Sequence, residues 1–214
     1  MSEQIEPGVP SSARAHDLEH VEHLFRRLGL GRLVRHLRPV ALWAAYVFVN
    51  AFLSIALLTL LAIATGVPFI FPSLGPTAYQ LFFQPRSAAS TPRNTLIGHC
   101  IGLVCGYAGF RVAAIPVTQA VASGNFDWRP VLASALSLST TAALMILLNA
   151  SHPPAGATTL IVSLGLITKP QYLLIIEAAV FVLVVQAFCI HRFAMLPYPV
   201  WKKPPPPATD ERAR

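Results

Sequence analysis

Residues 71–78, FPSLGPTA, and residues 151–159, SHPPAGATT, are two similar stretches that decide the fold. Each contains prolines and then a glycine followed two residues later by a threonine, and each leads into a short apolar run. With these runs the stretches cover residues 72–83 and 152–164, about half of the ~20 residues that a helix needs to cross a bilayer. The pattern predicts two short, proline-broken helices that face each other inside a membrane.

Four long apolar segments surround these two stretches. Residues 40–65 contain no charged side chain, and residues 95–114, 131–149 and 172–190 are each close to the length of a membrane span. Prolines 39, 92, 130 and 170 stand just before or at the four starts, where a missing N–H costs nothing. We therefore expect an all-α polytopic membrane protein with four long transmembrane helices and two short broken or re-entrant helices, arranged as two repeats.

The composition supports a membrane class. The chain has 214 residues, of which 54% are hydrophobic and only 12% charged, and its mean hydropathy is +0.57. Such a chain is too apolar for an ordinary soluble surface. We divide it into a cytoplasmic tail at residues 1–38, a transmembrane domain at residues 39–192, and a proline-rich basic cytoplasmic tail at residues 193–214.

The first tail has two parts. Residues 1–15 contain too little apolar surface to offset the cost of ordering, which predicts disorder. Apolar residues then recur at helical spacing beside several arginines, which indicates an amphipathic helix along the lipid headgroups. The apolar residues are Leu18, Val21, Leu24, Phe25 and Leu28, and Gly29 and Gly31 are expected to end the helix.

The charges that flank the spans bear on topology. If the short segments are re-entrant hairpins, the two repeats point the same way and Arg86 and Arg93 lie outside. If each short segment completes a crossing, the repeats are inverted and both arginines lie inside with the basic residues of the tails. Only Arg111, Arg129 and Lys169 would then be external, as the positive-inside rule demands. We favour the inverted arrangement, with both termini in the cytoplasm.

The broken segments must face the interior of the protein in either topology. Non-helical backbone at membrane depth survives only where protein or a wet cavity covers its amides and carbonyls. A short helix that begins at residues 75–77 or 153–154 would also direct free N–H groups into that interior. Such helix starts favour an anion.

Three separated motifs resemble one known family. Residues 151–158, together with residues 72–78 and 92–99, are similar to the HPP family of membrane proteins, and the likeness covers roughly residues 38–192. That family is described as having four transmembrane helices, and some of its plant and cyanobacterial members are implicated in nitrite transport. The resemblance implies a similar scaffold here. The internal duplication and the paired helix starts lead us to expect a transporter or channel for a small solute, with a small anion such as nitrite as the leading candidate.

We expect the solute path to be lined by residues of the two broken segments and of the second span. His152 can bind an anion or act as a titrating gate, or it can simply cap the short helix. His99 can contact the solute or make an interhelical bond. The glycines at 98, 102 and 106 indicate close helix packing. The complete set of pathway residues is His152, Pro153, Pro154, Gly156, Thr158, Gly75, Pro76, Thr77, His99 and Asn94.

Glu177 is the one carboxylate inside a predicted span. An unpaired charge in a membrane is costly enough to need a partner or a function. Arg111 is the natural partner, which predicts a structural ion pair, and a proton-coupling carboxylate is the alternative.

Other classes of function fit the sequence less well. The basic residues flank apolar segments rather than alternating with exposed aromatics, which argues against nucleic acid. We expect no metal, because no ligand set at metal spacing accompanies His99 and its neighbouring cysteines, and no cofactor. We expect no enzyme, because no nucleophile or carboxylate pair accompanies the histidines.

The leading hypothesis is a transporter or channel for a small solute in the inner (plasma) membrane. Four long spans leave room for assembly into a homo-oligomer. A scaffold or sensor is the alternative, and a histidine-dependent membrane enzyme comes last.

Overall fold

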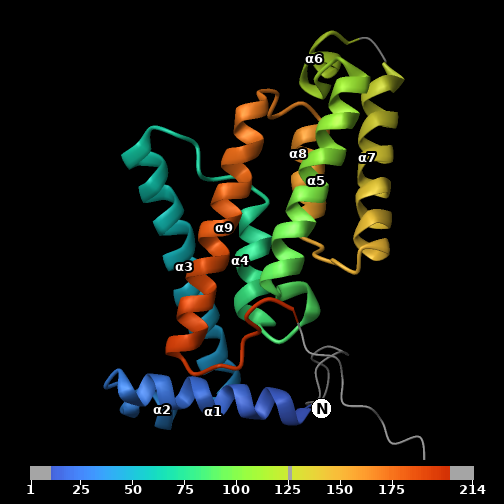
Figure 1. Ribbon diagram of the computed structural model, residues 1–214. Helices are drawn as coiled ribbons and strands as arrows, with labels where there is room; N and C mark the ends of the chain where they lie inside the picture. Colours follow the sequence, from blue (N-terminus) through green and yellow to red (C-terminus); the bar gives the residue numbers. More distant parts are fainter. Residues whose placement is uncertain (1–10, 125–126, 203–214) are drawn as a thin grey trace, which may run out of the picture.

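The computed structural model describes residues 11–124 and 127–202, and it is all-α within those ranges (Figure 1). Four of its helices are long and apolar enough to cross a membrane. They are α3 (Pro39–Thr65), α5 (Pro92–Ala113), α7 (Trp128–Leu147) and α9 (Pro170–Phe193). Large apolar side chains such as Phe48 (71% exposed) and Leu174 (76% exposed) cover their outer faces, as contact with lipid requires. The chain is a multi-pass membrane protein.

Prolines define three of the four starts. Pro39, Pro92 and Pro170 are the first residues of α3, α5 and α9, as predicted. In contrast, α7 begins two residues before Pro130, because the Asp127 carboxylate caps the helix by accepting from the Arg129 amide at 2.9 Å.

The two broken segments form the short helices α4 (Leu74–Phe83) and α8 (Ala155–Ser163). Each begins near the middle of the molecule after a non-helical stretch and completes a half crossing (Figure 1). Helix α4 runs from the middle to the end where α1 lies, whereas α8 runs to the opposite end, beside α6. Each repeat therefore crosses three times, and the repeats, α3–α4–α5 and α7–α8–α9, are inverted as favoured from the flanking charges.

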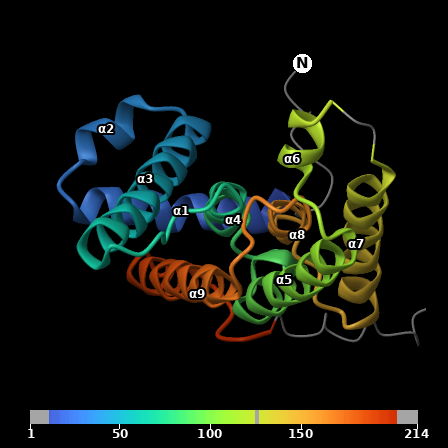
Figure 2. The same cartoon turned by 90° about the horizontal axis from the view of Figure 1, so that it is seen from above.

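The two repeats exchange their third helices. Helix α4 packs against α3 of its own repeat and α9 of the other, and α8 packs against α7 of its own repeat and α5 of the other. Seen from above, α4 and α8 lie in the centre, with α3 and α9 on one side and α5 and α7 on the other (Figure 2). The molecule thus consists of an α3–α4–α9 bundle and an α5–α7–α8 bundle, and we call the interface between these bundles the seam.

The helices α1 (Ser11–Arg27) and α2 (Gly31–His36) lie crosswise at one end of the bundles (Figure 1). Val21, Leu24 and Phe25 are buried against the core, as the predicted interfacial helix requires, although Leu28 is 56% exposed. The expectation of disorder was wrong for residues 11–15, which are helical, and residues 1–10 lie outside the described ranges. Arg86 and Asp17 form an ion pair at 2.7 Å that ties α1 to the turn after α4.

The segment after α9 folds back over the α1 end of the spans, so the predicted tail does not start at residue 193. The main-chain carbonyl of Trp201 accepts from the Arg93 amide at 3.1 Å. The Tyr198 hydroxyl donates to the Ser90 carbonyl in η1 (Ala88–Ser90) at 2.6 Å. Burial raises the pKa of the Tyr198 phenol, which keeps it a donor. The four consecutive prolines lie outside the described residues.

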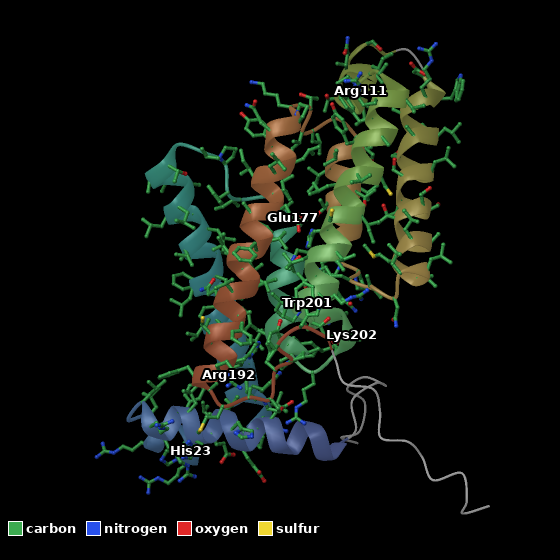
Figure 3. The ribbon with its side chains drawn as sticks, in the orientation of Figure 1. His23, Arg111, Glu177, Arg192, Trp201 and Lys202 are labelled. Carbon is green, nitrogen blue, oxygen red and sulfur yellow. The ribbon has the colours of Figure 1, made fainter. Side chains whose placement is uncertain are left out.

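The opposite end carries α6 (Val117–Ala122), a short helix that the sequence did not predict. Arg111 lies at this end, whereas Arg192 and Lys202 lie at the α1 end, with α1 itself (Figure 3). The two ends of the molecule therefore differ in basic charge in the sense that the sequence predicted.

Candidate functional site

The starts of α4 and α8 meet at the seam in the centre of the molecule. Thr77 lies in the first turn of α4 and Thr158 in the first turn of α8, and each follows its glycine by two residues. The two threonines therefore occupy the same position in the two inverted repeats. Both are completely buried.

One histidine of α5 connects these two threonines. His99 Nε2 lies 3.0 Å from Thr77 Oγ1, and His99 Nδ1 lies 2.8 Å from Thr158 Oγ1. The ring of His152 lies beside it, with the two ring centroids 5.1 Å apart. Thr77, His99, His152 and Thr158, which we call the central cluster, are all 0% exposed, so the cluster is closed to both sides of the membrane.

His152 is held by a main-chain acceptor in the connection between α4 and α5. Its Nδ1 lies 2.7 Å from the Ala89 carbonyl in η1, and its Nε2 lies 3.5 Å from Thr77 Oγ1. Since a carbonyl only accepts, Nδ1 must carry a proton, and Nε2 of the neutral ring is then an acceptor. The pair of prolines after His152 starts α8 at once and so fixes the imidazole at the seam.

The hydrogen bonds of the cluster run in one direction. The Thr77 hydroxyl is 2.9 Å from the Ser73 carbonyl and donates to it, which leaves Thr77 to accept from His99 Nε2–H. His99 Nδ1 then accepts from the Thr158 hydroxyl. With both rings neutral, every donor in the cluster is engaged, and His152 Nε2 is left as an acceptor without a donor.

The expectation of free N–H groups at the short helix starts was wrong for α8. The amides of Ala155, Gly156 and Ala157 each donate to the carbonyl three residues earlier, at 3.0–3.1 Å. In α4 the Leu74 amide donates to the Phe71 carbonyl at 2.9 Å, and Pro76 has no N–H. The tight turn that begins α8 therefore satisfies its own amides, as buried main-chain groups require.

The remaining predicted pathway residues lie away from the central cluster. Gly75 and Pro76 are exposed on the outer side of α4, where Gly75 lines an apolar groove with α3. Gly156 faces Leu138 of α7. Asn94 is buried at the start of α5, where its amide donates to the Ala88 carbonyl at 2.9 Å.

The glycines of α5 pack against the second broken segment, as predicted. A Cβ added at Gly98 would lie 2.8 Å from the His152 Cβ. One added at Gly102 would lie 2.8 Å from the Ala155 carbonyl oxygen, and one added at Gly106 would lie 2.7 Å from that of Thr159. These contacts place α8 directly on α5 and bring Thr158 within reach of His99.

The predicted ion pair between Glu177 and Arg111 does not form. Arg111 lies at the α6 end, where its guanidinium faces Tyr107 of the same helix, while Glu177 lies deeper, between α9 and α5 (Figure 3). Arg111 is exposed. A long basic side chain near a helix end extends to the interface rather than entering the bilayer, which explains the separation.

Some buried polar groups were not singled out from the sequence. His191 near the end of α9 bonds the Tyr46 hydroxyl at 2.9 Å and faces the Leu81 carbonyl of α4 at 3.2 Å, so it joins three helices of one bundle. Arg93 donates to the Leu148 and Asn149 carbonyls after α7, at 3.1 and 2.7 Å. A histidine at the end of an apolar segment was a usable sequence signal for His191. The contacts of Arg93 had no such signal, because its acceptors are main-chain carbonyls.

The inverted repeats, the broken helix starts and the buried polar cluster at their meeting point define a class: polytopic α-helical membrane proteins with a closed central site. The model of the family described as "HPP, transmembrane region" matches residues 37–199, so the chain belongs to the HPP family.

The chain is also similar to a transmembrane protein of Dictyostelium discoideum. The two are 28% identical over 149 residues, which cover 68% of this chain and 49% of that protein. The chain thus spans about half the length of this relative. No solved structure matches.

Proposed function

We propose that this protein transports a small anion, such as nitrite, along the seam between its two bundles. The observation that carries the proposal is the link from Thr77 through His99 to Thr158. It joins the same position of two inverted repeats, where membrane carriers with inverted repeats place their substrate site. The HPP membership makes nitrite the first solute to test.

The chemistry of the central cluster favours an anion over a cation. Its side chains are hydroxyls and imidazoles, and no carboxylate is bonded to them in the described residues. A site for a hard metal cation such as Ca²⁺ or Mg²⁺ would instead use carboxylate or carbonyl oxygens. When the bundles separate, the Nε2–H of His99 loses its acceptor Thr77 and is free to donate to an anion in the seam. The Thr77 hydroxyl can then rotate from the Ser73 carbonyl toward the same anion, so the site solvates the anion without trapping it by a full charge.

The two bundles are the natural moving parts. Thr77 belongs to the α3–α4–α9 bundle, whereas His99, His152 and Thr158 belong to the α5–α7–α8 bundle. A rocking motion at the seam breaks the contacts of Thr77 with His99 and His152 and leaves each bundle intact, so the site opens to one face at a time. We place the α1 end and both termini in the cytoplasm of a cell with the protein in its inner membrane, because basic residues gather at that end.

Anion uptake into sealed liposomes tests the proposal. We expect the purified protein to give saturable uptake of nitrite, which nitrate, formate or chloride inhibits to different degrees. Protein-free liposomes measure the passive entry of nitrous acid. A protein that moves none of these anions under any gradient has no such function, and a scaffold or sensor role would then replace it.

A further inference from the structure

Glu177 occupies the place in the second repeat that His99 occupies in the first. Pro92 and Pro170 are the first residues of α5 and α9, and His99 and Glu177 each come seven residues later (99 − 92 = 7 and 177 − 170 = 7). Seven residues are about 10 Å of helix. Because the repeats are inverted, the two side chains lie at similar depths from opposite ends of the molecule.

Glu177 faces the seam without a positive partner. Its carboxylate lies between α9 and α5 and interacts electrostatically with the Cys100 thiol, which follows His99 directly (Figure 3). Its Oε2 atom is buried and has no hydrogen-bond partner within the described part of the chain. An ionised carboxylate in this position is costly, and a proton removes that cost.

The other titratable groups on neighbouring helices do not supply a counter-charge. On α5, Arg111 pairs with Tyr107, and His99 is engaged by two threonines. On α3, the Tyr46 hydroxyl bonds His191, which is fourteen residues from Glu177 along α9 (191 − 177 = 14). On α4, Tyr79 is 52% exposed and stacks on Phe83.

The packing on the two sides of the seam explains why only one of these ionisable residues is enclosed. The positions of α9 that correspond to Gly98, Gly102 and Gly106 hold Ile176, Val180 and Val184 (each number plus 78). Branched side chains keep α9 further from α4 than α5 is from α8, and α9 and α4 are in less extensive contact. His99 is therefore locked into hydrogen bonds, whereas the carboxylate of Glu177 is left free to exchange a proton.

We propose that Glu177 carries a proton across the membrane together with the anion, an inference that rests on the proposed transport function. An ionised Glu177 repels an anion in the seam, and a protonated Glu177 admits it. One proton and one monovalent anion then cross as a pair, with no net charge moved.

Proton-driven nitrite uptake tests the role of Glu177. Liposomes that contain a pH indicator are given an inward proton gradient, with wild type, Glu177→Gln and the matched control Glu22→Gln, whose carboxylate lies on α1 beside Arg26 at 4.0 Å. We expect the wild type and Glu22→Gln to accumulate nitrite and acidify the lumen beyond protein-free liposomes. Glu177→Gln should still exchange nitrite for nitrite. Its gradient-driven nitrite uptake should fall at least about tenfold below that of the wild type, a factor that corresponds to about 1.4 kcal/mol.

The outcomes separate the inference from the function. Nitrite exchange with unchanged proton coupling in Glu177→Gln overturns the role of Glu177 and leaves transport intact. A wild type that moves no anion overturns both. If Glu177→Gln does not fold, two other results test the inference. The Glu177→Asp variant must retain the proton coupling of nitrite uptake. In the wild-type protein, the infrared stretch of a protonated carboxyl group must disappear as the pH is raised. Failure of either result also refutes the inference.

Discussion

Replacement of Thr77 by valine is expected to lower nitrite uptake at least about tenfold while the protein still folds. Valine keeps the shape of threonine but removes the hydroxyl that lies 3.0 Å from His99 and 3.5 Å from His152. An unpaired buried polar group costs about 1–3 kcal/mol, and 1.4 kcal/mol is a factor of ten. Thr77 is the one cluster residue on the α3–α4–α9 bundle, so the variant leaves the solute with polar contacts on a single bundle.

Thr159→Val is the matched control for this experiment. Thr159 is also fully buried, but its hydroxyl bonds Thr141 at 3.0 Å and the Ala155 carbonyl at 3.2 Å, both within the α5–α7–α8 bundle. We expect its uptake to stay close to the wild-type rate once the amount of folded protein is matched. Equal losses in the two variants would show that the seam has no special role.

Replacement of Gly102 by alanine is expected to destabilise the protein by about 1–3 kcal/mol, the usual cost of overpacking a tight contact. The new Cβ would lie 2.8 Å from the Ala155 carbonyl oxygen and 2.9 Å from Thr159 Oγ1, and the first of these belongs to backbone that cannot rotate away. Denaturant titration in detergent, followed by circular dichroism, measures the change.

Gly75→Ala serves as the control for packing. A Cβ at Gly75 meets no atom within 4 Å, so we expect its free energy of unfolding to stay unchanged or rise slightly. If both variants lose the same stability, the close approach of α5 and α8 is not what holds the central cluster together.

Much of the architecture was predictable because it depends on local signals. The glycine-x-threonine repeats after proline predicted α4 and α8, and prolines 39, 92 and 170 marked the helix starts. The asymmetry of basic residues selected the inverted topology over the parallel one. Each of these signals acts through backbone geometry or the membrane interface, so it needs no knowledge of tertiary contacts.

The exchange of third helices between the repeats could not be predicted in the same way. The four spans are predominantly apolar, and their sequences do not say which neighbouring span each face contacts. The pairing of Glu177 with Arg111 was wrong for this reason, since sequence placed both near the same end but did not give their separation. The partner of His152 was also out of reach, because Ala89 contributes only its carbonyl.

Spin-label distances across the seam test the central claim, that the two bundles move against each other around the central cluster. Cysteines replace exposed residues at the α6 end (Thr65 with Trp128) and at the α1 end (Leu147 with Phe193), in a protein whose three native cysteines are changed to alanine. Each pair has one label on each bundle. We predict that nitrite shifts the two distance distributions in opposite directions, one longer and one shorter. Distributions that stay unchanged, or that lengthen together, would contradict a seam that opens to one face at a time.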